Sequence, residues 1–490
     1  MSYENIGKTG ATAVVSNYGG NFPINGADPA VIIEAAWAYV AGLGGGNIFL
    51  DGAGERWTTA SQIDSQGSNV VLHGGGVGAP EIYLGNGLDT DIINIGNLHE
   101  NIYLGYLDLN GNWTNQTRDD SGGGETATSR GIRNLGENVH VYKSYLHEIA
   151  QHAITFAQCV GGTAHHNYVS YIGWNGIFTY RLPISHGIGI QIHDNHIEHC
   201  SDVGAGCYGH RTNIHHNYIH DIDQSFGANE FQWGIGIESG DYNQACNNTI
   251  DNVQAGIVTG WPALEDPQHF LIDGNIISGL TNAEGGGHGI YVNGRNCVVS
   301  NNIIDEVPAF VLPWGVGIMV DTGANNVKIH GNSINGFGTG DGFVGIRVAT
   351  EDDISIDDNE VHGLTYSGIQ LNGSCNRIKM RNNVIYDGLR GIYFDDVGQS
   401  DDCLISGNYI HSMSLYGINA QNTDDLHVIG NVIRDCAVGI DMSNANSVRT
   451  VLDSNDFFGC TNDVDVALAT NPLYGGNKNQ AGLWIENLEP

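Results

Sequence analysis

The chain has 490 residues, and its 54 acidic residues against 18 Lys and Arg give a formal net charge of −36. Such a surface repels nucleic acid and anionic membranes, and no apolar run is long enough to span a bilayer. An acidic, Lys-poor surface favours a high-salt habitat, where self-repulsion is screened; an ordinary acidic secreted protein is the alternative.

The first predicted element is a helix over residues 28–43. Asp28 is placed to cap it, Pro29 to begin it, and a run of three glycines from Gly44 to end it. A first strand follows at Asn47. We expect the helix to close one end of a β-core, where strand edges would otherwise be exposed.

The N-terminus at Met1 has no basic segment followed by an apolar one, so no secretory signal is predicted. We expect either a mature form or a protein that leaves the cell by another route, such as on a virus particle.

A short motif recurs from about Gly131 to Cys460: Gly-Ile-x-apolar, a polar stretch, then apolar-x-apolar-x-x-Asn-x-Ile. Most copies open roughly 22 to 28 residues apart, a period typical of a solenoid in which each repeat buries its apolar face against its neighbours. Short alternating runs within each repeat, separated by Gly, Asn and Asp, predict strands. The predicted fold is therefore all-β, a parallel β-helix with an N-terminal capping helix.

The Asn of the second motif recurs from Asn167 to Asn455. Asn tolerates the left-handed backbone of a tight corner, and stacked Asn side chains can pair their amides from coil to coil. We expect these residues to build corners and not a ligand site.

Three segments are predicted along the chain. Residues 1–50 form a tail and the capping helix, residues 51–460 the β-helix, and residues 461–490 a C-terminal cap or tail. Residues 113–130 are polar and Gly-rich and predict a long loop beside the sheet. The nine Cys contain no Cys-x-x-Cys pair, and several stand where other repeats carry Val or Leu, so we expect free thiols in the core.

The candidate site lies on one outward face of the β-helix. In each Gly-Ile-x-apolar strand the second and fourth residues after the Gly point outward and form ladders, with rungs about 5 Å apart. The coils that open between Gly176 and Gly256 combine Arg, Tyr, His and Glu on these ladders. The candidate catalytic residues are Tyr180, Arg181, Tyr208, His210, Arg211 and Glu238. The candidate substrate-binding residues are Arg133, Phe178, Asp241, Trp261, Asn293 and Asp321.

Three interpretations of this cluster stay open. In catalysis, an Arg pair neutralises a uronate carboxylate, and a Tyr or His removes or returns the neighbouring C5 proton. Alternatively, Glu238 and Asp241 would serve a hydrolase as paired carboxylates. In passive binding, the aromatic faces and carboxylates hold neutral sugar. In the third interpretation the ladder only covers the sheet.

Histidine is abundant, with 21 residues. His193, His196, His215 and Asp221 can be argued as metal ligands. Their spacing follows the coil period, however, so stacked surface histidines at corners explain the pattern. No metal and no other cofactor is predicted.

Residues 26–460 resemble the pectate-lyase-like right-handed β-helix superfamily, and within it the alginate C5-epimerase type most. The cap from Asp28 with the run Ile48–Gly54, the segment Leu107–Asn112 and the repeats carry the resemblance. It implies a single-stranded right-handed parallel β-helix, a fold that hosts lyases, epimerases, hydrolases and viral tailspikes. The Asp-Pro-His-Glu run of the epimerases is replaced by residues 153–158, so both catalytic positions are lost. Arg118 or Arg133 stands where that family keeps a basic residue.

The leading expectation is an extracellular or virion-surface protein of tailspike type that recognises, and in its catalytic form cleaves, a polysaccharide or host surface glycan. The alternatives are a free polysaccharide lyase or C5-epimerase acting on a uronate-containing glycan, and a non-catalytic structural virion or surface protein. A homotrimer or attachment to a larger assembly is compatible with this expectation. Neither nucleic acid binding nor membrane insertion is expected.

Overall fold

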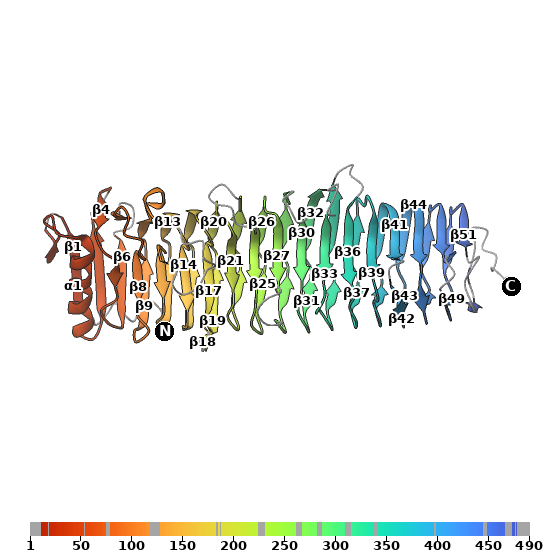
Figure 1. Cartoon of the computed structure of the whole chain (residues 1–490), viewed down its shortest axis with the longest axis horizontal. Helices are drawn as coiled ribbons and strands as arrows, with labels where there is room; N and C mark the ends of the chain where they lie inside the picture. Colours follow the sequence, from red (N-terminus) through yellow and green to blue (C-terminus); the bar gives the residue numbers. More distant parts are fainter. Residues whose placement is uncertain are drawn as a thin grey trace. The chain divides into compact units, whose positions relative to one another are not determined.

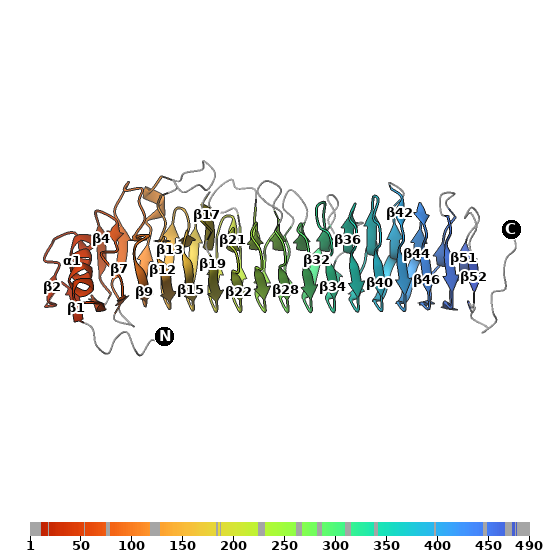
Figure 2. The ribbon, with the colours of Figure 1, turned by 90° about the horizontal axis from the view of Figure 1, so that it is seen from below.

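The computed structural model describes residues 11–17, 19–52, 54–74, 79–117, 128–182, 185–186, 188–223, 231–260, 267–281, 287–308, 315–337, 342–395, 398–443, 448–465, 473–475 and 477. The chain divides into two units, residues 1–249 and 250–490. In each unit, successive coils stack as parallel strands in three rows (Figures 1 and 2).

In residues 1–249 each full coil contributes one strand to each row. The first row contains β1 (Ala11–Ser16), β3 (Gly46–Asp51), β6 (Val70–Gly74), β9 (Glu100–Gly105), β12 (Glu137–Tyr142), β15 (Val160–His165), β19 (Ile188–His193), β22 (Asn213–His215) and β25 (Gln244–Cys246), with β2 (Phe22–Pro23) beside β1. The second row contains β4 (Arg56–Thr59), β7 (Glu81–Leu84), β10 (Asp108–Asn110), β13 (Tyr145–Ile149), β16 (Tyr168–Ile172), β20 (His196–Glu198) and β23 (Tyr218–His220). The third row contains β5 (Ile63–Asp64), β8 (Ile93–Ile95), β11 (Ile132–Asn134), β14 (Ile154–Ala157), β17 (Ile177–Leu182), β21 (Val203–Cys207) and β24 (Trp233–Ile237). A short antiparallel strand, β18 (Ser185–His186), pairs with β17, and a 3-10 turn, η2 (Trp113–Asn115), follows β10.

Residues 250–490 repeat this arrangement. The first row contains β28 (Leu271–Asp273), β31 (Val298–Ser300), β34 (Lys328–His330), β37 (Ser355–Asp357), β40 (Lys379–Arg381), β43 (Leu404–Ser406), β46 (His427–Ile429), β49 (Val451–Asp453) and β52 (Leu473–Gly475). The second row contains β29 (Ile276–Ser278), β32 (Ile303–Pro308), β35 (Ser333–Phe337), β38 (Glu360–His362), β47 (Val432–Arg434) and β50 (Asp456–Phe458). The third row contains β27 (Ala255–Thr259), β30 (His288–Val292), β33 (Val316–Val320), β36 (Val344–Ala349), β39 (Ser367–Asn372), β48 (Val438–Asp441) and β51 (Asn462–Asp465). Two long strands, β41 (Val384–Phe394) and β44 (Tyr409–Ala420), run through both the second and third rows, and β42 (Ser400–Asp401) pairs with β45 (Thr423–Asp424). Strand β26 (Thr249–Asp251) crosses the unit boundary.

The predicted inward ladder forms the core. Ile132 of β11, Ile154 of β14 and Ile177 of β17 are register partners, and none is exposed to solvent. Each inward side chain therefore packs on the same position one coil away, which buries it fully although no single coil has an interior of its own.

The predicted capping helix is confirmed as α1 (Pro29–Gly42). Asp28 accepts a hydrogen bond from the Ala30 amide at 3.1 Å, and Pro29 occupies the first turn. The buried side of α1, which includes Ile33 and Trp37, covers the first coils of its unit (Figure 1). The sequence did not predict β1, which lies before the helix and pairs in parallel with β3.

The predicted Asn ladder is also confirmed, once in each unit. Asn195 Nδ2 donates to Asn217 Oδ1 at 2.9 Å, and Asn217 Nδ2 donates to Asn248 Oδ1 at 3.0 Å. The same amide-to-amide bond links successive coils from Asn275 to Asn477. The left-handed residue of the corner is the one before the ladder Asn, from Asn167 to Asn455, for example His216 with a φ of 55°. The ladder Asn itself therefore contributes hydrogen bonds and not a left-handed backbone.

Three further expectations concern the thiols, the loop and the C-terminus. All nine Cys are free, as predicted. The predicted loop 113–130 lies outside the described residues over 118–127. Within the predicted cap 461–490, β51 and β52 continue the pairing of β48 and β49, and most other residues lie outside the described part of the chain. No described helix is long and apolar enough to cross a membrane.

Candidate functional site

The outward ladders of the third row in residues 1–249 follow the predicted alternation. Thr155, Phe178 and Gly206 are register partners on one ladder, and Ala157 and Tyr180 are partners on the next. Phe178, Tyr180 and Ala157 form a buried cluster, with Tyr208 and Leu135 packed against it. Gly206 leaves space for the Phe178 ring, because a Cβ at Gly206 would lie 2.5 Å from that ring.

Glu238 follows β24 and meets Tyr208, whose hydroxyl donates a hydrogen bond to the Glu238 carboxylate. Desolvation raises the pKa of Glu238 from 4.5 to about 8; the Tyr208 hydrogen bond acts in the opposite direction, and the charge of Asp202 adds to the rise. Glu238 is therefore protonated at neutral pH, although its side chain keeps some exposure to solvent. A protonated carboxyl near pH 7 is what a general acid requires.

Asp202 is the second carboxylate of this cluster, and the sequence did not single it out. It lies in the turn between β20 and β21, is 8% exposed, and accepts a hydrogen bond from Trp174 Nε1 at 2.5 Å. Desolvation and contact with Glu238 raise the pKa of Tyr208 most, and the negative charge of Asp202 adds to the rise. The carboxylate that acts on Glu238 is thus Asp202, whereas the sequence suggested Asp241.

Tyr180 is held from the other side by a buried histidine. Its hydroxyl lies 2.8 Å from His152 Nε2, and His152 Nδ1 has no hydrogen-bond partner among the described residues. Burial lowers the pKa of His152 well below its usual value, and the nearby Arg130 guanidinium lowers it further. Burial raises the pKa of Tyr180, against the opposing effect of Arg130. The pair is therefore a neutral imidazole beside a neutral phenol.

Arg130 is the cation close to this cluster, and it too was not predicted. Its side chain is 3% exposed, and Nη1 lies 3.9 Å from Asp91 Oδ2. The Arg130 amide also donates to Asp91 Oδ1 at 3.1 Å. Arg130 is consequently held inside the protein and is not presented to a ligand. We refer to Glu238, Tyr208, Tyr180, Asp202 and His152 as the Glu238 site.

The structure separates other predicted catalytic residues from this site. Arg211 has a left-handed backbone with a φ of 55° and lines a groove of about 460 Å³ with first-row residues such as Gln191 and Gln244. His210 Nδ1 accepts a hydrogen bond from the Asp241 amide at 2.9 Å and lies 4.0 Å from the Asp241 carboxylate. The Arg181 side chain lies outside what the structure describes.

The predicted substrate-binding residues are similarly divided. Phe178 has no exposed surface, so it supports the Glu238 site from within and cannot contact a ligand. Arg133 is partly exposed on the same ladder, as a register partner of Thr155. Trp261 lies outside the described residues, and Asn293 and Asp321 belong to the unit formed by residues 250–490.

Residues 250–490 carry a polar array of their own on the third row. With its amide oxygen facing Arg347, Asn372 accepts from Arg347 Nη2 at 2.5 Å and donates to Asp395 Oδ2 at 2.9 Å. Gln370, between Arg347 and Tyr393 in the register, is fully buried, and neither of its amide atoms has a hydrogen-bond partner among the described residues.

Asp321 lies at one end of this array. The Tyr291 hydroxyl donates a hydrogen bond to Asp321, and the rings of Tyr291 and His288 lie 5.6 Å apart. The backbone N–H of Asn293 donates a hydrogen bond to Thr259 Oγ1 at 3.1 Å. Burial lowers the pKa of His288 to about 4. This array holds its groups in place by mutual contacts.

Comparison with known proteins gives one family match and several structural ones. Residues 271–481 match the family described as periplasmic copper-binding protein (NosD). The mannuronan C-5 epimerase AlgE6 A-module of Azotobacter vinelandii is 16% identical over 92% of this chain and 95% of its own, with a TM-score of 0.40. The DFA-IIIase of Arthrobacter chlorophenolicus A6, solved without its lid, is 12% identical over 71% of this chain and 94% of its own, with a TM-score of 0.50. No curated protein matches the chain.

At these identities the likeness concerns the fold. The chain therefore has a parallel β-helix fold, similar to that of the DFA-IIIase structure.

Proposed function

We propose that the chain binds a glycan at the Glu238 site and hydrolyses a glycosidic bond there. The observation that carries this proposal is the Glu238 carboxyl, protonated near neutral pH, oriented by the Tyr208 hydroxyl and close to the charge of Asp202. Two carboxyl groups whose environments differ in this way are the usual means of glycoside hydrolysis.

In the proposed reaction, Glu238 donates its proton to the glycosidic oxygen as the bond from that oxygen to the anomeric carbon breaks. Water supplies the hydroxyl group to the anomeric carbon and gives its other proton to the Glu238 carboxylate, which regenerates the acid, while Asp202 stabilises the positive charge that develops at that carbon. Tyr208, which is only partly buried, provides aromatic surface for a sugar ring, and Tyr180 packs behind it. The fold contributes to the proposal only in that it is shared with carbohydrate-active enzymes.

A lyase or epimerase is the second candidate, and one contact favours it. The Tyr180 hydroxyl lies 2.8 Å from His152 Nε2, so a proton taken by Tyr180 has a neutral acceptor beside it. However, burial raises the pKa of Tyr180. Burial and the neighbouring Glu238 raise the pKa of Tyr208. Both tyrosines therefore resist the ionisation that an attacking base needs. Hydrolysis with Glu238 as acid is therefore the reaction we favour.

The test is incubation of the full chain in high salt with neutral and uronate-containing polysaccharides. Bound sugar, new reducing ends, chain length and unsaturated uronate are measured together. Shortened chains with new reducing ends and no unsaturated uronate support hydrolysis, provided that Glu238→Gln keeps binding and loses cleavage. Unsaturated uronate would instead indicate a lyase. Binding without shortening would indicate an adhesin, and no binding a structural role; either result overturns the proposal.

The proposed setting is outside the cell, on a tailspike-type assembly of a salt-loving system. The net charge of −36 supports the high-salt habitat, because self-repulsion of that size is weakened by screening. The test is thermal melting in dilute buffer and in molar salt, with equal melting temperatures counting against it. Sedimentation of the full chain would test the trimer.

A further inference from the structure

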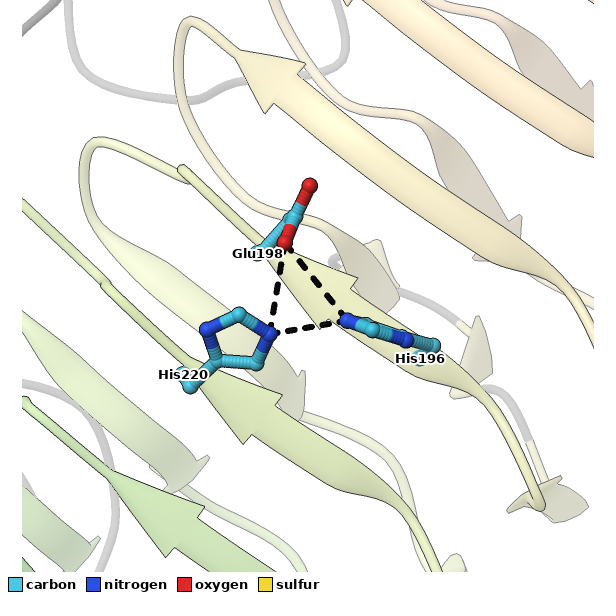
Figure 3. A group of neighbouring side chains, drawn as sticks. All are labelled: His196, Glu198 and His220. Atoms are coloured by element: carbon cyan, nitrogen blue, oxygen red, sulfur yellow. Dashed lines mark hydrogen bonds and ion pairs between the residues drawn. The ribbon is translucent and has the colours of Figure 1, made fainter.

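A compact group of three metal-binding side chains lies on the second row of residues 1–249, apart from the residues assigned to the Glu238 site. His196 and Glu198 stand two positions apart on β20, and His220 ends the neighbouring strand β23 (Figure 3). Glu198 and His220 are register partners, as are the fully buried Ile197 and Ile219. Because residues alternate along a strand, His196, Glu198 and His220 all point outward.

The donor atoms converge on one point. His196 Nε2 lies 2.8 Å from His220 Nε2, and Glu198 Oε2 lies 3.5 Å from His196 Nε2 and 3.3 Å from His220 Nε2. A tetrahedral zinc ion, with ligands at about 2.0–2.1 Å, separates its ligand atoms by about 3.3–3.4 Å. Two of the three separations already match, and the third needs only a small rotation of the rings.

A second set of contacts fixes these donors in the orientation that a metal requires. Asp221 Oδ2 lies 2.6 Å from His220 Nδ1, which directs Nε2 toward the group. The Tyr168 hydroxyl donates to Glu198 Oε1, which leaves Oε2 facing the two imidazoles. The His196 ring is flanked by Tyr168 and Tyr218, with ring centroids at 4.6 and 5.1 Å. A carboxylate on the second nitrogen of a ligand histidine is a regular feature of metal sites.

We propose that His196, Glu198 and His220 bind a divalent transition-metal ion of the zinc and copper class. Two imidazoles and one carboxylate suit Zn²⁺ or Cu²⁺ and not Ca²⁺ or Mg²⁺, which prefer oxygen ligands. Three protein ligands leave a further coordination position for water or for a polar group of a ligand. This is the only group of three convergent His, Cys, Asp or Glu side chains within the described part of the chain.

The site is independent of the glycan proposal and of the family match. It lies outside residues 271–481, and it uses none of the residues assigned to glycan cleavage. Of the histidines that the sequence offered as ligands, the site takes His196 and uses Asp221 as the partner of a ligand. His193 and His215 instead stack their rings at 4.9 Å on the first row.

The experiment is calorimetric titration of the full, chelator-treated chain with Zn²⁺, Cu²⁺ and Ca²⁺. We expect one tight equivalent of Zn²⁺ or Cu²⁺ and none of Ca²⁺. That equivalent should be lost in His196→Ala and in His220→Ala, and Asp221→Asn should bind about 10- to 100-fold more weakly. The control is the double variant His215→Ala/His216→Ala, which removes another close imidazole pair, with Nδ1 atoms 2.8 Å apart, and should keep the site.

Electron paramagnetic resonance of the Cu²⁺ form gives a second readout, because nitrogen hyperfine coupling counts the imidazole ligands. Two coupled nitrogens in the unaltered chain, and loss of that bound-copper spectrum in His196→Ala, would support the site. Circular dichroism identifies any variant that fails to fold, and Glu198→Gln then serves as a variant of equal size that should also bind more weakly. Unchanged affinity in folded His196→Ala and His220→Ala, or an equal loss in the control, overturns the proposal.

Discussion

Replacing Glu238 with Gln should abolish cleavage and, at the same time, stabilise the fold. Desolvation raises the pKa of Glu238 from 4.5 to about 8, with a smaller rise from the charge of Asp202. A shift of this size corresponds to about 5 kcal/mol. It is an upper bound, because the side chain keeps some contact with solvent, which weakens the effect.

The sign follows from the protonation of each state. The unfolded chain releases the Glu238 proton near pH 4.5, whereas the folded chain keeps it until about pH 8. Stability of the wild type is therefore unaffected by this group below pH 4.5 and falls as the pH rises from 4.5 to 8. Gln does not titrate, so Glu238→Gln should match the wild type at the acidic end and exceed it by up to about 3 kcal/mol at neutral pH.

The assay is urea unfolding followed by circular dichroism, at both ends of this pH range and at neutral pH. Glu137→Gln is the control, since Glu137 is an exposed carboxylate on β12 and should change little at any pH. A Glu238→Gln chain that is no more stable than the wild type at the alkaline end would refute the proposed burial of a neutral carboxyl.

Three other changes test the surrounding structure. Asp202→Asn removes a charge that raises the pKa of Glu238, so the alkaline limb of the cleavage profile should move to lower pH; an unmoved limb would mean that Asp202 does not act on the acid. Asn217→Ala removes the bonds to Asn195 and the Ile192 carbonyl and should destabilise by at least about 2 kcal/mol in urea unfolding, whereas Asn97→Ala, at an exposed turn, should cost under about 0.5 kcal/mol. Gln370→Leu replaces a buried amide that lacks partners among the described residues and should raise the unfolding midpoint; a lower midpoint would show that the amide is satisfied.

The repeated parts of the fold were predictable because two simple patterns repeat without interruption. Period-two alternation places Ile177 in the core and Phe178 on the opposite face of the strand, and the recurrent Asn marks each corner. Strand β1 alternates over only a few residues, with Ala13 and Val15 buried, and no ladder Asn follows it before α1. It is one strand of the first coil and pairs with β3 across the whole of α1, so its partner could not be found from local sequence.

The Glu238 site was only half visible in the sequence. Tyr180 stands on β17, and Tyr208 and Glu238 come directly after β21 and β24, so the alternation of these strands places them together. Asp202 lies in a turn between rows, where no period fixes the direction of a side chain. Arg211 stands only three residues after Tyr208 in the sequence, but the left-handed residue there turns the chain toward the first row, so the two side chains serve different surfaces.

A β-helix can carry a costly group such as a buried neutral Glu because its stability is distributed. Each coil is held mainly by its neighbours, through inward apolar ladders and the Asn ladder, and neither ladder includes Glu238. The outward positions are therefore available for groups that lower stability. Each such group lowers the free energy of unfolding of only the few coils around it. It follows that stability and activity should respond oppositely at Glu238 but together at Asn217, since only the second change weakens the frame that holds the site.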